Sequence, residues 1–95
     1  MKATKFDIAE YLDDDEMIQE YLNTVLEDGE PNDIIVAFGH VARAIGMTKL
    51  AEKTGMSRPS LYKALQEDSK PQFETILKLL RAMGGSLKVD NIRLS

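Results

Sequence analysis

The segment from Met47 to Leu65, MTKLAEKTGMSRPSLYKAL, restricts the fold of this chain more than any other. Counted from Met47, a small residue stands fifth (Ala51), a glycine ninth (Gly55) and a leucine fifteenth (Leu61). Glycine readily adopts the positive φ that ends a helix in a sharp turn, and a small side chain lets a second helix cross close by. We therefore expect a helix, a tight turn and a second helix. The apolar positions expected to face inward are Leu50, Met56, Leu61 and Leu65.

Two helices joined in this way form the helix-turn-helix, whose second helix enters the major groove of DNA. Arg58 lies near the start of that helix, and its guanidinium matches the O6 and N7 acceptors of guanine. Thr48 and Ser57 can cap the two helices or contact phosphates. The alternative is a helical corner with ordinary surface charges, in which Tyr62 packs only against its own domain. The residues expected to contact DNA are Thr48, Lys49, Ser57, Arg58, Ser60, Tyr62 and Lys63.

The rest of the chain also reads as helical up to residue 85, so we expect an all-α fold of five to six helices. Acidic side chains and proline favour helix starts, and glycine favours helix ends. The expected helices outside the helix-turn-helix are 7–12, 13–28, 31–45 and 73–83. We expect a single domain, 1–95, with an acidic N-terminal helical extension (1–30), a helix-turn-helix core (31–85) and a C-terminal strand (86–95). Gly39, inside the third helix, suggests a close helix contact.

The strand is predicted because Leu87 and Val89 alternate with Lys88 and Asp90. After Asn91 the alternation slips by one residue, which is consistent with a bulge. A single strand needs an edge to pair with, and the helices offer none. Its partner would be the N-terminal segment, a second copy of the strand or another protein.

Charge divides the chain into two parts. Residues 1–33 carry eleven acidic and two basic side chains, whereas residues 34–95 carry ten basic and five acidic ones, for a net charge of −4. Such asymmetry suggests one anionic and one cationic partner. The alternative is an acidic helix face that serves only solubility.

Other classes of function find little support. The chain has no cysteine and no apolar run long enough for a signal peptide or a membrane span, so we expect a soluble, cytoplasmic protein without a membrane partner. His40 is the only histidine, and Asp13, Asp14 and Asp15 cannot all converge on one cation from the start of a helix. We expect no catalytic residue, no metal and no cofactor, and hence no enzyme.

Residues 47–84 resemble the phage-repressor (Xre-type) helix-turn-helix domain. The second half of that resemblance is a proline-led last helix with an alanine-apolar-glycine end: Pro71-Gln72-Phe73-Glu74-Thr75-Ile76, Leu79 and Arg81-Ala82-Met83-Gly84. Nearly all of residues 6–90 resemble the addiction-module antidote proteins, which are antitoxins related to the HigA type. The residues that carry this wider resemblance are Phe6-Asp7, Glu10-Tyr11-Leu12, Tyr21-Leu22, Leu26-Glu27-Asp28-Gly29, Ala42-Arg43-Ala44-Ile45-Gly46-Met47, Ser57-Arg58 and Leu61-Tyr62-Lys63-Ala64-Leu65.

The resemblance implies an antitoxin of a bacterial type II toxin-antitoxin module that neutralises a small basic RelE-like ribonuclease toxin and represses its own operon. It places the recognition-helix positions on Ser57, Arg58, Ser60, Tyr62 and Lys63. Two positions depart from the family pattern. Gln72 weakens the cap of the last helix, and Pro59 removes a side chain that often reaches DNA in this group.

A stand-alone Xre-type repressor without a toxin is the alternative function, and an interaction module that no longer binds DNA is a weaker one. One helix-turn-helix reads only a half-site of operator DNA, so a homodimer is expected. Its interface would be the final helix or the strand. For the toxin, the first choice of surface is the acidic helix and the second is the strand at 87–92. The residues assigned to toxin binding are Asp14, Glu16, Glu20 and Glu27.

Overall fold

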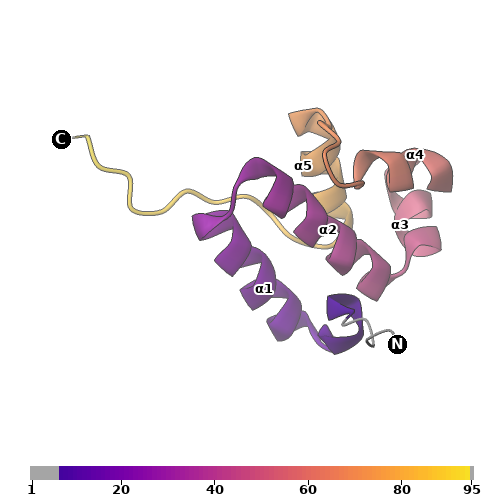
Figure 1. Ribbon diagram of the computed structural model, residues 1–95, viewed down its shortest axis with the longest axis horizontal. Coiled ribbons are helices and arrows are strands. Elements are labelled where there is room, and N and C mark those ends of the chain that lie inside the picture. The colour runs from indigo at the N-terminus through magenta and orange to yellow at the C-terminus, as the bar shows by residue number, and fades with distance from the viewer. Residues whose placement is uncertain (1–6, 95) are drawn as a thin grey trace, which may run out of the picture.

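The computed structural model describes residues 7–94, and this part of the chain contains six helical segments. In chain order they are the 3₁₀-helix η1 (Ile8–Tyr11) and the α-helices α1 (Asp15–Asp28), α2 (Pro31–Ile45), α3 (Met47–Thr54), α4 (Arg58–Ala64) and α5 (Phe73–Ala82). Helix α2 lies between α1 on one side and α3, α4 and α5 on the other (Figure 1). The all-α prediction is confirmed for this range.

Helix α2 lies at the centre of the molecule. Its sequence supplies a signal for its start, an apolar face for packing and a glycine at its end. Pro31 occupies the first helical position, and the Glu30 amide donates to Asp33 Oδ2 over 3.1 Å. Five positions of α2 are buried and face the neighbouring helices or their loops: Ala37, Phe38, Gly39, Val41 and Ala42. Gly46, with φ of +121°, ends α2 and leads directly into α3 at a bend of 104°.

One hydrophobic core joins the helices. Its most deeply buried side chains come from four of them, so α4 and α5 are held to the same centre as α2 and α3. Each fully buried leucine or phenylalanine contributes about 1.5–3 kcal/mol relative to exposure. Within residues 7–94 no polar or charged side chain is buried. The five largest fully buried side chains are Phe38, Val41, Leu50, Leu61 and Leu79.

Gly39 marks a close helix contact, as the sequence suggested. A Cβ atom at this position would lie 3.2 Å from the carbonyl oxygen of Leu65, at the end of α4. A second tie holds the loop after α4 against α2, because the Asp68 amide donates to Asn32 Oδ1 over 2.6 Å. Asp68 itself has a positive φ of 66°. The sequence carried no signal for this long-range bond.

Acidic side chains cap the first two helices, as expected for helix starts. Asp14 Oδ1 accepts the Met17 amide over 2.8 Å and begins α1, while Asp7 Oδ1 accepts the Ala9 amide over 3.1 Å. The element after Asp7 is a 3₁₀-helix, shorter than the helix expected up to residue 12. Gly29 follows α1 with an ordinary φ of −79°, so the reason for glycine there is space: a Cβ atom would lie 2.6 Å from the Val25 carbonyl oxygen.

The predicted C-terminal strand is wrong. Residues 86–94 follow α5 without any strand assignment, and all of them are exposed. The physical reason is the missing edge: a strand is stable only when its backbone pairs with another, and the described body is helical. Residue 95 and the N-terminal segment 1–6, one of the pairing partners considered, lie outside the described residues.

Three apolar residues assigned to helix faces are exposed. Met17 and Leu26 of α1 expose 42% and 40% of their surface, and Phe73 at the start of α5 exposes 66%. In the described range, no single helix has the length and hydropathy of a membrane span, although α2 and α3 would meet that test together if they were not bent by 104°.

Candidate functional site

Helices α3 and α4 form a corner whose turn is held by local bonds. Leu50 and Ala51 bury the inner face of α3, and Gly55 ends the helix with a φ of +77° in the left-handed region. No atom lies within 4 Å of the place where a Gly55 side chain would stand, so glycine is favoured there by backbone conformation alone. Thr54 Oγ1 donates to the Leu50 carbonyl oxygen over 2.8 Å and accepts the Met56 amide over 3.2 Å.

Helix α4 begins at a cap that the sequence predicted. Ser57 Oγ accepts the Ser60 amide over 3.1 Å, and Pro59 lies in the first turn, where its missing N–H is harmless. The helix has only seven residues, too few to be stable alone. Leu61, which is 0% exposed, and Leu65, which is 8% exposed, fix its orientation against the core.

The outer side of α4 carries the residues assigned to DNA. Arg58, Ser60, Tyr62 and Lys63 are all exposed, and they lie on one short helix with Ser57 at its start. The Arg58 guanidinium lies 5.7 Å from the Tyr62 ring centroid, and its Nη2 donates to the Tyr62 hydroxyl over 3.2 Å. Stacking of this kind orients the arginine while leaving other N–H donors for an acceptor in a groove.

Thr48 and Lys49 lie at the start of α3, and both are exposed. The prediction that Thr48 caps α3 is wrong, because α3 begins at Met47 and Gly46 occupies the cap position. Only Gly46 separates α2 from α3, so Thr48 is already the second residue of α3 and lies inside its first turn. Its hydroxyl and the ammonium group of Lys49 remain on the surface beside the corner.

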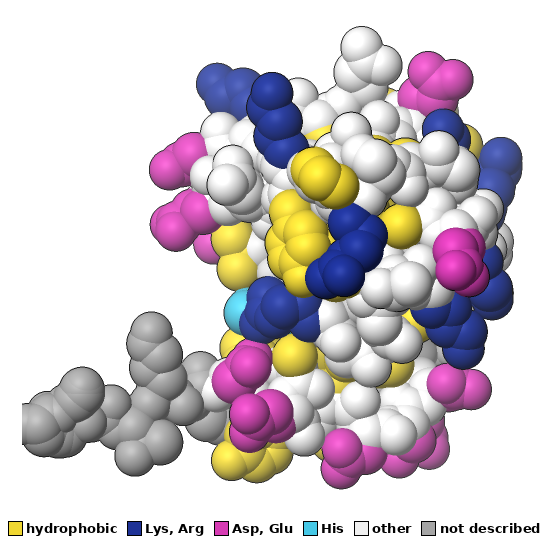
Figure 2. Space-filling view, turned by 90° about the vertical axis from the view of Figure 1, so that its right-hand side faces the viewer, with side chains coloured by type: hydrophobic (Ala, Val, Ile, Leu, Met, Phe, Trp, Pro, Cys, Tyr) yellow, Lys and Arg dark blue, Asp and Glu magenta, His cyan; other side chains and the backbone are white. Residues whose placement is uncertain are grey.

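The corner is basic. Residues 47–65 carry four basic side chains and one acidic one, a net of +3. Figure 2 looks onto this end of the molecule, with Lys and Arg side chains at the centre, along the right-hand edge and at the upper left; acidic side chains line the lower edge, and a few others lie at the left and right sides. Cations spread over an exposed helix corner suit a polyanion, because each can neutralise a phosphate.

Helix α1 has the opposite charge. Asp15, Glu16, Glu20, Glu27 and Asp28 give it five acidic groups and no basic one. At 100° per residue, Glu16, Glu20 and Glu27 fall within 40° of one another, on the side opposite buried Leu22. All three are exposed and form one stripe, which we call the acidic face. Asp14 stands apart from this stripe as the helix cap.

The two charged surfaces do not share a side of the molecule. Helix α1 packs against α2, and α4 packs against α3, so α2 separates them (Figure 1). A partner on the acidic face would therefore leave the outer side of α4 open.

Sequence reasoning missed a polar cluster between η1 and α2. Arg43 Nη2 donates to Asp7 Oδ1 over 2.9 Å and lies 3.1 Å from His40 Nδ1. The hydrogen bond from Arg43 lowers the pKa of Asp7, helped by the Ala9 amide. Burial lowers the pKa of His40, with a further contribution from Arg43 that Asp7 opposes. His40 also lies 6.2 Å from the Tyr21 ring, so the cluster ties η1 and α1 to α2.

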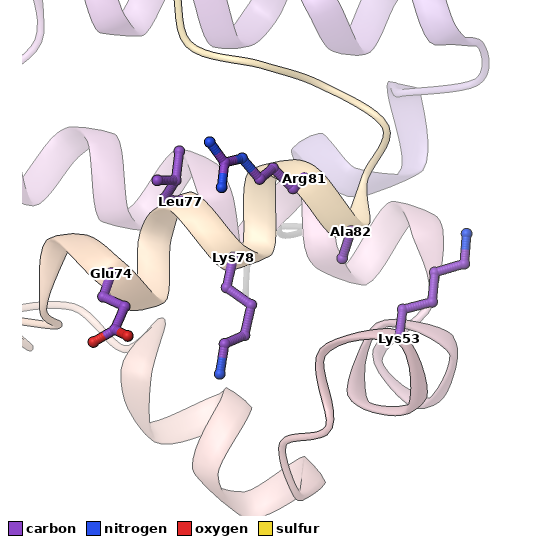
Figure 3. Close-up of a pocket in the computed structure, with 6 residues that line it drawn as sticks. All are labelled: Lys53, Glu74, Leu77, Lys78, Arg81 and Ala82. Atoms are coloured by element: carbon purple, nitrogen blue, oxygen red, sulfur yellow. The ribbon is translucent and has the colours of Figure 1, made fainter.

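A shallow groove between α3 and α5 is lined by three cations, but they do not converge on a common point. Lys78 and Arg81 extend to opposite sides of α5, and Lys53 points away from both (Figure 3). The groove therefore offers no anion site, although its cations add to the positive charge beside the corner. Among residues 7–94, no group of three or more His, Cys, Asp or Glu side chains is placed to hold a metal ion.

Comparison with known proteins identifies the family. The sequence profile described as "Probable addiction module antidote protein" matches residues 2–91. An uncharacterized protein of Haemophilus influenzae is 40% identical over 88 residues, which cover 93% of this chain and 91% of that protein. No solved structure matches the chain. Both matches run through the acidic helix, the α3–α4 corner and α5, and the chain thus belongs to the family of probable addiction module antidote proteins.

Proposed function

We propose that the protein is the antitoxin of a type II toxin-antitoxin module, which neutralises a RelE-like ribonuclease toxin and represses its own operon through the α3–α4 corner. The family match over residues 2–91 carries the antitoxin part of this proposal. An antidote acts by binding, so the role is regulatory and needs no catalytic group.

The repressor part is supported by the exposed outer side of α4. Arg58 supplies a bidentate donor for a guanine edge, and Tyr62 and Lys63 lie one turn further along the same helix. Ser57, Thr48 and Lys49 flank it with hydroxyl, amide and ammonium donors for phosphates. The proposed site reads operator DNA from a helix-turn-helix of the phage-repressor type.

A single corner reads one half-site, so the proposed DNA-bound form is a homodimer. Its two α4 helices would stand about 34 Å apart, one turn of the double helix, or a whole multiple of that distance. Two-fold symmetry would then match a pseudo-palindromic operator.

The acidic face of α1 is the proposed toxin surface. A ribonuclease that binds RNA presents cations, and an exposed stripe of glutamates would complement them and speed association. Because α2 separates α1 from α4, the toxin and DNA would bind at the same time. Asp14 lies outside the acidic face and its carboxylate caps α1, so in this proposal it adds only negative charge near the toxin surface.

The test co-expresses the antitoxin with the product of any short basic reading frame that adjoins its gene. Wild-type protein should relieve the growth arrest that the basic product causes and co-purify with it in equal amounts. Reversal of the acidic face, Glu16→Lys, Glu20→Lys and Glu27→Lys together, should abolish both effects. The matched control reverses three exposed glutamates elsewhere, Glu52, Glu67 and Glu74.

The control protein should still neutralise the toxin. If both triple variants lose toxin neutralisation equally, the toxin does not bind specifically to the acidic face of α1. Absence of any co-purifying partner, with operator binding intact, would favour a stand-alone repressor of the Xre type, whose corner would be the same.

A further inference from the structure

Residues 86–94, which we call the tail, extend from the body with their backbone unpaired. Within the described range, no backbone hydrogen bond joins these residues to any helix. The tail runs past α1 and projects beyond it, on the side of the molecule away from α4 (Figure 1, yellow). Its apolar side chains are exposed: Leu87 by 46%, Val89 by 71%, Ile92 by 73% and Leu94 by 98%. An extended chain with free N–H and C=O groups and exposed apolar side chains suits pairing with another strand.

The start of the tail is held in place. The Gly85 amide donates to the Leu80 carbonyl oxygen over 2.9 Å, and Gly84 adopts a φ of +89°. Gly85 fits tightly there, because a Cβ atom would lie 2.9 Å from Leu80 Cδ1. Residues 84–88 also line a groove with α1 and the end of α2. The tail therefore leaves the body in a defined direction, which lowers the entropic cost of pairing.

A backbone kink gives the tail one apolar face. In an extended chain successive side chains alternate, so Leu87 and Val89 share a face that Ile92 would miss by one residue. Asn91 has a φ of +61°, the left-handed conformation found at the first position of one class of β-bulge. A bulge at Asn91 returns Ile92 to the face of Leu87 and Val89, and leaves Lys88 and Asp90 on the opposite face.

The charges on that opposite face select a partner. A two-fold axis that relates two antiparallel strands lies midway between one residue and its own copy. Residues directly opposite each other point to the same face of the pair. A pair of tails centred on Lys88 or on Asp90 would place that residue opposite its own copy, and two like charges would then face each other. Centred on Val89, it places each Lys88 opposite the Asp90 of the other copy, and Val89 opposite itself. The bulge then puts Ile92 opposite Leu87 on the apolar face.

We propose that the tails of two copies of this chain pair as an antiparallel β-ribbon centred on Val89, and that this ribbon is the interface of the homodimer. The proposal deepens the homodimer of the proposed function and rests on that part of it. The predicted strand then forms only in the dimer, because the second copy supplies the missing edge. The alternative occupants, the sheet edge of a toxin and the segment 1–6, are separated from it by the tests below.

The first test exchanges charges in the isolated protein, without DNA or toxin, and measures the dimer dissociation constant by analytical ultracentrifugation. Lys88→Asp and Asp90→Lys should each raise that constant by about tenfold or more, since two attractive cross-strand pairs become repulsive. The double variant Lys88→Asp/Asp90→Lys should restore the wild-type value. Arg93→Asp is the matched control, because Arg93 faces Ser86 in this register and its reversal should change the constant little.

The second test uses the absence of cysteine, which makes any disulfide in a single-cysteine variant intermolecular. Val89→Cys should give nearly complete covalent dimer under mild oxidation, whereas Leu87→Cys should give little, since Leu87 does not oppose itself. A chain that stops after Gly85 should be monomeric.

An unchanged dimer in the truncated chain, equal cross-linking at positions 87 and 89, or failure of the double charge exchange to restore dimerisation would each overturn the proposal. These tests are independent of toxin neutralisation and of half-site binding, which are measured separately. A truncated chain that is monomeric but still neutralises the toxin would support the ribbon and exclude the tail as the toxin site. Loss of toxin binding together with unchanged dimerisation would assign the tail to the toxin's sheet instead.

Discussion

Replacement of Leu61 by alanine tests how the orientation of α4 is maintained. Leu61 is 0% exposed, and α4 has only seven residues, so this side chain and Leu65 are its main attachment to the core. Truncation of a fully buried leucine costs about 2.7–5 kcal/mol, of which part reflects the cavity left behind. We expect about 3 kcal/mol for Leu61→Ala, toward the lower end because a short helix can partly settle into the space.

For a domain of this size the loss is large. A 95-residue chain is stable by roughly 5–14 kcal/mol, and each kcal/mol corresponds to about 4–8 °C in melting temperature. Leu61→Ala should therefore melt about 12–24 °C lower. In urea its transition midpoint should fall by about 1–3 M with an unchanged slope. Both quantities can be followed by far-ultraviolet circular dichroism.

Lys63→Ala is the matched control on the same helix. Lys63 is exposed, so its replacement should change stability by less than about 0.5 kcal/mol. It should weaken DNA binding nonetheless, because it removes a proposed phosphate contact. A loss below about 1 kcal/mol for Leu61→Ala would refute the conclusion that core burial holds α4 in place.

Three further predictions follow from other parts of the structure. Gly55→Ala should destabilise by about 1–2 kcal/mol in the same urea experiment, because alanine at a φ of +77° is strained although nothing obstructs its methyl group; an unchanged midpoint would show that the turn relaxes. Asp14→Ala should cost about 1 kcal/mol through the lost α1 cap, and Asp14→Asn, which keeps the acceptor, should cost much less. The pKa of His40 in the folded protein lies below its ordinary value of 6.5, so the native protein favours the neutral imidazole. Its contribution to stability is fully present above pH 6.5 and is lost as the pH falls from there through the lower pKa of the folded state. The melting temperature should accordingly fall between pH 7.5 and 5.5 by more in wild type than in His40→Gln, and equal falls would contradict the burial of His40.

The helices and most of their ends could be predicted because their signals are local. A carboxylate or hydroxyl one residue before a helix, as at Asp14 and Ser57, caps it whatever the rest of the chain does. Gly55 could be predicted for the same reason, since the turn after α3 requires a positive φ. The expected cap of α3 at Thr48 is wrong because α2 and α3 share Gly46 as their junction, and the sequence pattern does not reveal that the two helices are contiguous.

The parts that could not be predicted depend on residues distant in the sequence. The Arg43–Asp7 and Asp68–Asn32 contacts each join residues 36 positions apart, and no local pattern indicates them. The prediction of a C-terminal strand was wrong because alternation of apolar and polar residues shows only that a segment is able to pair. A strand forms only when a partner strand is also present. The residues expected to contact DNA and the acidic residues assigned to the toxin were predicted as sequence groups. The structure places the first group on α3, α4 and the cap of α4 and the second on α1 and its cap, and all of these residues are exposed.

The role of the α3–α4 corner is tested by binding of the purified protein to a duplex from the region upstream of its gene, followed by fluorescence anisotropy over a range of salt concentrations. We predict specific binding whose logarithmic salt slope is steep, and a double variant, Arg58→Ala/Lys63→Ala, that binds at least tenfold more weakly with a slope reduced by about one to two while remaining folded. No binding of the wild type at low salt, or equal binding by the double variant, would contradict the claim that the α3–α4 corner reads operator DNA.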